Sequence, residues 1–377
     1  MIAVLVASLA LAIWLYLLLC NGGFWMAREH DSANVSAPPV KWPSVVAVVP
    51  ARDEADVIAR SIGSLAAQDY LGSFRIILVD DGSSDGTAGI AEGLSSDRLT
   101  ILRGAALAPG WTGKLWAVSQ GISTSGEADY LWLTDADIEH APDTLRSLVT
   151  RAEGHSLTLV SLMAKLRCET LAERALVPAF IYFFQMLYPF ARANAPTGQA
   201  AAAGGCMLVR RDALERAGGI GMIRGALIDD CAFGALMKRQ GRIWIGLTDR
   251  SRSIRPYDGF GPIAAMISRS AYAQLDYSPL KLAGTLAGLA LVYGVPPVIG
   301  LTGDGAARAT GLLTWALMAL SFQPMLRFYR RSPLWGLALP LIATFYACCT
   351  LLSGWQHWRG RGGTWKGRAQ AMAQRSR

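Results

Sequence analysis

Charged residues are scarce in this chain: they make up 17% of its 377 residues, against about 25% in a typical soluble domain. Hydrophobic residues reach 52%, and the mean hydropathy is +0.29. This composition excludes a disordered chain and argues against an ordinary soluble enzyme. The apolar residues gather at the two ends, which also disfavours a bundle lying wholly in the membrane. The length predicts one large domain or two smaller ones, with membrane-spanning segments added.

Metal-ligating residues are also few and scattered. The six cysteines form no C-x-x-C pair, and the four histidines have no ligand spacing. Neither a zinc site nor a disulfide framework is therefore expected, and the central region suits a reducing compartment. The net charge of +8 fits membrane topology and contact with anionic lipid. No aromatic-basic face is present, so binding of nucleic acid is not expected.

The first apolar run is Ile2–Cys20, which carries no charge and is long enough to span a bilayer. No positive residue precedes it and no small-residue cleavage site follows it. We therefore expect an uncleaved anchor over residues 1–22 rather than a signal peptide. Arg28 and Lys41 follow the anchor, which predicts that the next residues lie in the cytoplasm.

Three further apolar stretches fall within residues 280–354, at about 280–301, 309–326 and 335–354. If all three cross the membrane, the basic tail at 355–377 lies outside, against the tendency of basic residues to stay inside. Pro296-Pro297 and Pro340 could turn one stretch into a re-entrant or interfacial helix. The sequence leaves the topology of this last third open.

Between about residues 43 and 250, short runs of β-branched and aliphatic residues alternate with helical patterns. The expected strands cover Val45–Val49, Arg75–Val79 and Tyr130–Thr134. This alternation predicts parallel βαβ units, and hence an α/β fold with helices on both faces of a mostly parallel sheet. Ligands of such sheets bind at the carboxyl ends of the strands.

Acidic residues follow each of the three expected strands: Asp53-Glu54, Asp80-Asp81 and Asp135-Ala136-Asp137. Like charges repel, so acids gathered at one edge of a sheet do not stabilise the fold. A bound metal ion or sugar nucleotide explains their presence better. The D-x-D step offers oxygen ligands that suit Mg²⁺ or Mn²⁺. The alternative for D-x-D is a helix cap with a solvated loop. The glycine-containing segment after Asp81 could approach a ligand closely or could simply turn the chain from strand to helix.

Taken in order, these motifs resemble those of the family 2 inverting glycosyltransferases, which have the Rossmann-like GT-A fold. The matching segments are Pro50–Glu54, Val79–Ser83, Gly113–Ala117, Thr134–Asp137, Gly204–Arg211 and Ile228–Cys231. With the anchor, the segments Arg255–Gly259 and Thr364–Arg368 are similar to the bacterial hopene-associated glycosyltransferases. That narrower resemblance implies hopanoid lipid metabolism. It also implies a multi-pass protein of the bacterial inner (cytoplasmic) membrane, with the catalytic domain facing the cytoplasm.

The resemblance implies a role for each matching residue. The nucleotide-sugar site would contain Pro50, Arg52, Asp53, Glu54, Asp80, Asp81, Lys114 and Asp135. Within it, Asp53, Glu54 and Asp81 would contact the uracil and ribose of a UDP-sugar. Lys114 would lie near the nucleotide or its diphosphate. Asp137, helped by Asp135, would hold a divalent cation, Mg²⁺ or Mn²⁺, on the diphosphate.

The acceptor side is implied in the same way. Asp230 would be the general base, and without the family match it would be interpreted as a helix cap. Asp229 stands where the family usually has glutamate, which leaves open which of the two takes the proton. Gly204 and Gly205 would belong to the acceptor region. Arg269 could meet a phosphate there, or it could be an interfacial basic residue.

The expected reaction is transfer of a single sugar to a lipid. The Q-x-x-R-W motif of the family's processive polysaccharide synthases has no match in the corresponding region. The aromatic stretch 171–191 fits a helix along the membrane surface better than a core helix, and 251–279 is expected to be an amphipathic interfacial segment. The alternatives are a polyprenyl-phosphate acceptor or a non-catalytic GT-A membrane scaffold. The sequence predicts neither the donor sugar nor a protein partner.

Overall fold

The computed structural model describes residues 1–33, 37–360, 364–365 and 368–369, so most of the predicted basic tail lies outside the described residues. The described chain forms two compact units. The sheet unit contains Glu29–Arg167 and Arg192–Arg255, and the helical unit contains Met1–Arg28, Cys168–Ala191 and residues 256–360. Cys168–Ala191 therefore belongs to the helical unit, although it lies within residues 43–250, the range predicted for the catalytic domain.

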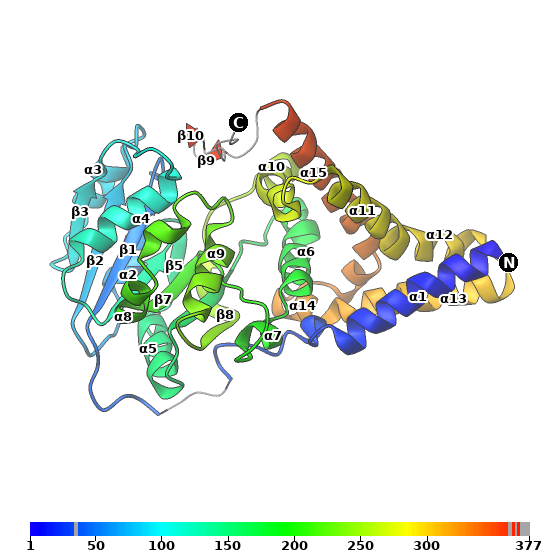
Figure 1. The fold of residues 1–377 in the computed structure, drawn as a ribbon, viewed down its shortest axis with the longest axis horizontal. Helices are drawn as coiled ribbons and strands as arrows, with labels where there is room; N and C mark the ends of the chain where they lie inside the picture. The colour runs from blue at the N-terminus through cyan, green and yellow to red at the C-terminus, as the bar shows by residue number, and fades with distance from the viewer. Residues whose placement is uncertain (34–36, 361–363, 366–367, 370–377) are drawn as a thin grey trace. The chain divides into compact units, whose positions relative to one another are not determined.

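An eight-stranded mixed sheet forms the centre of the sheet unit (Figure 1). In spatial order its strands are β3 (Leu99–Arg103), β2 (Phe74–Asp80), β1 (Val45–Ala51), β4 (Tyr130–Thr134), β7 (Cys206–Arg210), β6 (Leu159–Lys165), β8 (Ile243–Ser253) and β5 (Ile138–His140). The first four are parallel, and β7 runs antiparallel to both of its neighbours. β6 and β8 are parallel, and β5 is antiparallel to β8. The predicted α/β fold with a mostly parallel sheet is confirmed.

Helices cover both faces of the sheet because successive side chains of a strand point to opposite faces. In β1, Val45 and Val49 pack into one core, and Val46 and Val48 pack into the other. The first core is closed by α2 (Ile58–Ala66), α3 (Thr87–Glu92) and α5 (Thr144–Gly154). The second is closed by α4 (Gly113–Thr124), α8 (Arg211–Arg216) and α9 (Asp229–Lys238).

The three predicted strands all form. β4 has the predicted bounds, whereas β1 and β2 extend further, to Ala51 and Asp80, which lie opposite each other in the ladder. The strands therefore continue up to the acidic loops. Their buried apolar side chains explain why the sequence pattern found them.

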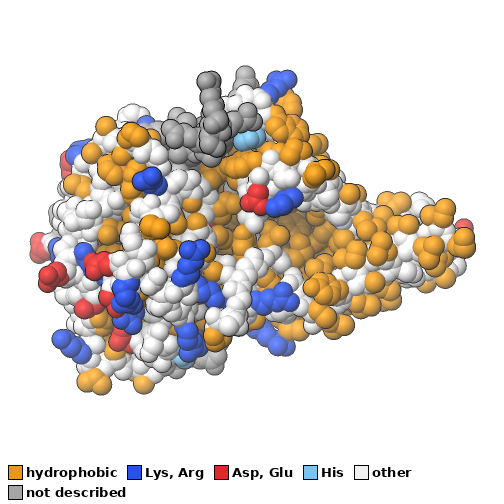
Figure 2. Space-filling view, in the orientation of Figure 1, with side chains coloured by type: hydrophobic (Ala, Val, Ile, Leu, Met, Phe, Trp, Pro, Cys, Tyr) orange, Lys and Arg blue, Asp and Glu red, His pale blue; other side chains and the backbone are white. Residues whose placement is uncertain are grey.

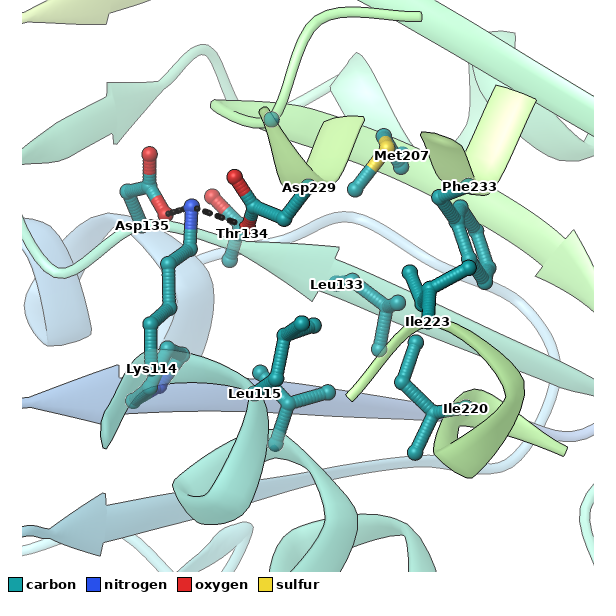
Figure 3. Close-up of a pocket in the computed structure, with 13 residues that line it drawn as sticks. Lys114, Leu115, Leu133, Thr134, Asp135, Met207, Ile220, Ile223, Asp229 and Phe233 are labelled. Atoms are coloured by element: carbon teal, nitrogen blue, oxygen red, sulfur yellow. Dashed lines mark ion pairs between the residues drawn. The ribbon is translucent and has the colours of Figure 1, made fainter. Parts of the chain in front are cut away.

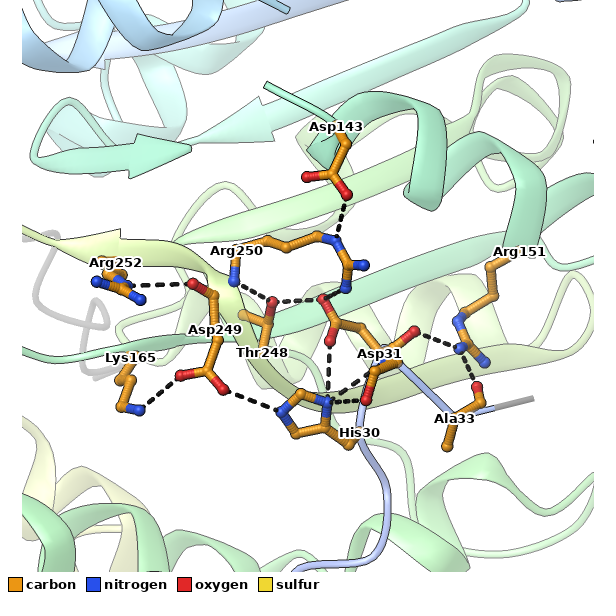
Figure 4. A network of polar contacts seen from close by, with 11 residues as sticks. His30, Asp31, Ala33, Asp143, Arg151, Lys165, Thr248, Asp249, Arg250 and Arg252 are labelled. Atoms are coloured by element: carbon orange, nitrogen blue, oxygen red, sulfur yellow. Dashed lines mark hydrogen bonds and ion pairs between the residues drawn. The ribbon is translucent and has the colours of Figure 1, made fainter. Parts of the chain in front are cut away.

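The segment that enters the sheet unit is held by a buried acid (Figure 4). Asp31 is 2% exposed, and its backbone N–H donates to the carbonyl of Leu247 in β8. Its carboxylate accepts a hydrogen bond from Thr248 Oγ1 at 2.5 Å and pairs with Arg250 Nη1 at 3.0 Å. The chain therefore joins the sheet unit as a fixed part of its fold rather than as a loose connection.

The helical unit consists of long apolar helices. Its helices are α1 (Ile2–Cys20), α6 (Leu171–Leu187), α10 (Phe260–Ala271), α11 (Pro279–Leu289), α12 (Val295–Thr302), α13 (Gly305–Ser321), α14 (Gln323–Phe328) and α15 (Leu339–Trp358); α7 (Phe190–Asn194) lies at the boundary of the two units. A π-helical turn at Ala290–Gly294 continues α11 into α12. α1 packs against both α12 and α13.

Three stretches among the described residues are long and apolar enough to cross a membrane: Ile2–Cys20, Pro279–Thr302 and Gly305–Phe328. Their outer surface is hydrophobic (Figure 2), with exposed side chains that include Leu5, Leu9, Val298, Leu301 and Leu320. The anchor and two of the three predicted C-terminal stretches thus form such helices. The third stretch forms α15, which is not among them.

α6 differs from the predicted surface helix. Ten of its side chains are buried, and the ring of Tyr182 packs against those of Phe24 and Phe322 within the helical unit. A capping box between Thr170 and Glu173 starts the helix. α6 is therefore a core helix of this unit. Its aromatic residues reflect internal packing.

Candidate active site

A lysine and two aspartates meet at the carboxyl end of β4 (Figure 3). Nζ of Lys114 lies 2.7 Å from Oδ1 of Asp135 and 3.4 Å from Oδ2 of Asp229. Asp135 directly follows β4, Lys114 lies in the first turn of α4, and Asp229 begins α9. Thr112 caps α4 by accepting a hydrogen bond from the N–H of Leu115, which fixes the turn that carries the lysine.

Asp230 joins this cluster through the backbone. Its carboxylate accepts hydrogen bonds from the N–H of Gly204 at 3.3 Å and of Cys231 at 2.7 Å. A Cβ atom on Gly204 would lie 3.2 Å from Lys114 Nζ and 3.6 Å from Asp230 Cβ. Because Gly204 has no side chain, the loop that precedes β7 can lie close to both Lys114 and Asp230. The structure brings together residues that the sequence places far apart.

Burial and charge shift the acidity of the cluster. Burial raises the pKa of Asp230 to about 6, the negative charge of Asp229 acts in the same direction, and Lys114 opposes both. Burial also raises the pKa of Asp135. Lys114 opposes this rise, and the charges of Asp137 and Asp229 add to it by smaller amounts. Burial disfavours the charged form of Lys114, but the two aspartates it contacts raise its pKa, so it stays protonated.

A pocket next to this cluster is polar at one end and apolar at the other (Figure 3). Lys114, Asp135 and Asp229 form the polar end. The remaining lining residues are Pro50, Leu115, Val118, Leu133, Thr134, Gly204, Met207, Ile220, Ile223 and Phe233. Three predicted donor-site residues, Pro50, Lys114 and Asp135, thus line one pocket together with Asp229.

Hydrogen bonds join the loops after β1 and β2. The N–H of Asp53 donates to Ser83 Oγ at 3.0 Å, and the Asp53 carboxylate accepts from the N–H of Ser84 at 2.8 Å. The N–H of Glu54 donates to Thr87 Oγ1 at 2.8 Å. Asp53 has a φ of 50°, a conformation that few non-glycine residues adopt. The two predicted donor loops therefore form one connected edge.

The paired aspartates after β2 are both buried. Asp80 lies 3.1 Å from Nη1 of Arg103 and accepts a hydrogen bond from the N–H of Ser83. Asp81 is 1% exposed, and its backbone carbonyl accepts a hydrogen bond from Arg52. Arg52 also lies 3.8 Å from the Asp81 carboxylate. Asp80 and Arg52 thus hold this edge together, whatever they contact in a bound donor.

An arginine that the sequence analysis did not assign lies across the predicted donor and metal residues. Arg255 donates to both carboxylate oxygens of Glu54, at 2.6 and 2.5 Å, and to Asp137 Oδ2 at 3.0 Å. Ser253 Oγ donates to the same oxygen of Asp137 at 3.2 Å. The only sequence signal was its position in a segment similar to one family, with no role attached.

The two predicted metal ligands remain close, but no complete metal site is formed. Among the described residues, no three His, Cys, Asp or Glu side chains are grouped so as to hold a metal ion. Asp135 and Asp137 pair with Lys114 and Arg255 respectively. Their carboxylate oxygens are the donors that Mg²⁺ and Mn²⁺ prefer, and such ions complete their shell with water and phosphate. The donor set therefore fits a divalent cation, whose charge would favour the ionised form of the carboxylate that burial disfavours at Asp135.

The remaining predicted residues of the acceptor region lie in different units. A Cβ atom on Gly205 would meet Ala164 Cβ at 3.1 Å, so this glycine allows close packing within the sheet unit. Arg269 belongs to the helical unit, where it is exposed near the end of α10. The structure thus supports Gly204 as a part of the cluster and gives Gly205 a packing role.

Comparison with known proteins identifies the class of this domain. Residues 46–218 match the family described as Glycosyl transferase family 2. The chain also has the fold of the mannosyltransferase PcManGT from Pyrobaculum calidifontis, solved in complex with GDP-Man and Mn²⁺. The TM-score is 0.60 at 20% identity, over 94% of this chain and 99% of that one. The predicted GT-A fold is confirmed, and so is the predicted enzyme class, a glycosyltransferase, for this domain.

Two curated relatives are N-acetylglucosaminyltransferases. The protein from Rhizobium leguminosarum bv. viciae is 34% identical over 121 residues, which are 30% of this chain. The protein from Mesorhizobium japonicum is 30% identical over 135 residues, which are 34% of this chain. The chain spans 26% and 31% of the lengths of these two relatives.

Proposed function

We propose that this protein is a membrane-bound inverting glycosyltransferase that moves a single sugar from a nucleotide-sugar, UDP-linked, to a lipid acceptor. The observation that carries the proposal is the position of Asp230. It is a half-buried carboxylate whose pKa is raised to about 6, and it lies beside a lysine and aspartates at the carboxyl edge of the sheet.

Asp230 is the proposed general base. An acceptor hydroxyl is a weak nucleophile, so a positioned carboxylate accepts its proton as it attacks the sugar carbon that bears the diphosphate. A base works best when its pKa lies near the operating pH, and burial gives Asp230 this property. A single displacement needs no covalent enzyme intermediate and inverts the anomeric carbon. Asp229, which pairs with Lys114, is the weaker candidate for the base.

Asp135 and Asp137 would hold a divalent cation, and when bound this ion supplies positive charge to the departing diphosphate. The residues of this chain orient that end of the donor. Lys114 offers an ammonium group from the first turn of α4, and the joined loops with Asp53 and Asp81 would receive the nucleoside. The similar fold of a mannosyltransferase solved with GDP-Man and Mn²⁺ supports the cation.

A lipid acceptor is proposed because the catalytic domain shares its chain with an apolar helical unit. Three of its helical stretches could cross a bilayer, and their exposed side chains are hydrophobic. The narrower proposal, a hopanoid, rests on the resemblance of Arg255–Gly259 and of Thr364–Arg368, part of which lies outside the described residues.

Three spans also remove the conflict over topology. Arg28 follows the first span, Lys281 lies at the start of the second, and the loop 327–331 lies at the end of the third. Figure 1 shows the N-terminus close to the opposite end, where α12 is followed by α13. Basic residues favour the cytoplasmic side. We therefore propose that the catalytic domain and the loop after the third span both face the cytoplasm, at the bacterial inner membrane. α15 is not among the three candidate spans, so in this proposal it does not cross the bilayer.

The test uses the full chain reconstituted in vesicles that contain bacterial lipid extract and Mn²⁺. UDP-N-acetylglucosamine, UDP-glucose and GDP-mannose are offered separately, and lipid products are identified by mass spectrometry. One added sugar on a lipid, absent with Asp230→Asn, supports the proposal. Sugar on a polyprenyl phosphate would replace the hopanoid as acceptor. If no nucleotide-sugar is bound or consumed, the proposal is refuted.

A further inference from the structure

Arg255 forms an ion pair with each of two carboxylates to which the sequence assigned donor and metal roles. Its Nη2 lies 2.6 and 2.5 Å from the oxygens of Glu54, and its Nε lies 3.0 Å from Asp137 Oδ2. Glu54 follows β1 and Asp137 follows β4, so one guanidinium links the ends of two adjacent strands. Burial opposes the charge of Arg255, but the two acids raise its pKa further, so it is a permanent cation.

The side chain of Arg255 is more exposed to solvent than the two carboxylates that it pairs with. Glu54 is 8% exposed and Asp137 is 15% exposed, but the Arg255 side chain is 31% exposed. The backbone beneath is held, because the N–H of Ile254 donates to the carbonyl of Asp137 at 2.9 Å. The arginine follows the end of β8 and lies in no helix or strand. Its side chain can therefore turn away while both acids stay in place.

A buried carboxylate beside a half-buried one is stabilised by a compensating cation. Arg255 supplies that charge in the described structure by pairing with Asp137, an acid that would also hold a metal ion. Both cations are attracted by the same negative charge, so each weakens the binding of the other.

We infer that Arg255 is a built-in counter-ion that competes with the divalent cation for Asp137 and binds the donor diphosphate once the cation holds that acid. A guanidinium suits both partners, because its planar fork matches carboxylate and phosphate oxygens alike. This inference rests on the proposed function, since it takes a nucleoside diphosphate as the ligand of the site. In this inference the guanidinium of Arg255 exchanges its carboxylate partner for the diphosphate of the substrate.

The test compares Arg255→Gln with Arg252→Gln in the full chain. Arg252 is an exposed arginine of β8 that donates to the backbone carbonyl of Asp249, which makes it a matched control. Mn²⁺ affinity without nucleotide is measured by electron paramagnetic resonance. Affinities for uridine and guanosine di- and monophosphates in Mn²⁺ are measured by calorimetry.

We expect Arg255→Gln to bind Mn²⁺ about 10-fold more tightly and nucleoside diphosphate about 10-fold more weakly, the scale of one charge-assisted hydrogen bond. Monophosphate affinity should change less, and Arg252→Gln should match the wild type. Unchanged Mn²⁺ affinity in Arg255→Gln would overturn the competition, and unchanged diphosphate affinity would overturn the phosphate role.

Arg255→Lys covers the case in which the glutamine variant does not fold. It keeps the charge without the fork, so both affinities should move in the same directions by smaller amounts. If the lysine variant equals the wild type in both, the inference is wrong. Failure of the wild type to bind any nucleoside diphosphate would instead refute the proposed function, and the nucleotide-free Mn²⁺ measurement would still decide the competition.

Discussion

Replacement of Asp229 by asparagine should move the acidic side of the pH–activity profile to lower pH. Asp230, the proposed base, must be ionised to accept a proton, so activity falls as the pH drops through its pKa. Burial and the charge of Asp229 raise that pKa from 3.8 to about 6. Asparagine removes the second cause and leaves the burial unchanged.

The size of the effect follows from the order of these causes. Burial is the larger cause and Asp229 the second, so we expect the loss of Asp229 to lower the pKa by on the order of 1 pH unit, or ~1.4 kcal/mol. The lost pair between Asp229 and Lys114 acts in the same direction, because the lysine then exerts more of its charge on Asp230. At pH 5, a pKa near 5 instead of 6 raises the ionised fraction from about one tenth to about one half.

The assay measures kcat/KM for sugar transfer between about pH 4.5 and 8, with each profile scaled to its own plateau. Asp212→Asn is the matched control, because Asp212 is an exposed carboxylate of α8 that pairs with Arg210 and Arg216. Its profile should equal that of the wild type. An acidic limb that stays in place or moves upward in Asp229→Asn would refute the reasoning. Complete loss of transfer at every pH would make Asp229 the base.

Three further predictions address the base, the cation and the fold. Asp230→Asn should lower kcat by about 100- to 10,000-fold while calorimetry finds nucleotide binding intact; equal activity would exclude it as the base. Chelation of divalent ions, or Asp137→Ala, should abolish turnover, and added Mn²⁺ should rescue only the chelated wild type. Asp31→Asn should cost about 1 to 3 kcal/mol, because Arg250 loses its buried carboxylate partner and keeps only the exposed one, Asp143. Its melting temperature should fall, whereas an unchanged value would mean that this network adds no stability.

Local patterns in the sequence were enough to predict the strands that carry the site. β4 is a run of five buried residues, and its bounds match the prediction. The parallel register of β1 with β2 and β4 then brings their acidic ends to one edge, as the βαβ pattern implied. The pairing of Lys114 with Asp229 was not predictable, because no local pattern fixes a contact between residues so far apart.

The ion pairs of Arg255 were also not predictable from a local sequence pattern. Its contact with Glu54 spans 201 residues, and β8, which precedes it, joins the far side of the sheet. A single arginine after a strand has no sequence spacing that would predict two carboxylate partners. The prediction of a surface helix over residues 171–191 was wrong because a local pattern was present but ambiguous. Aromatic residues suit a membrane surface and a packed core equally well, and only the ring contacts of Tyr182 decide between the two.

The charges at the sheet edge give an independent reason to expect a divalent cation. Around the D-x-D step alone, five carboxylates, Glu54, Asp135, Asp137, Asp229 and Asp230, face the two cations Lys114 and Arg255. Each cation bridges two acids from different elements, so neither can turn to an anionic diphosphate without leaving a buried acid unbalanced. A donor therefore brings negative charge to a site that already has an excess of it. Only an added positive ion resolves this, and the same ion would release an existing cation to the diphosphate.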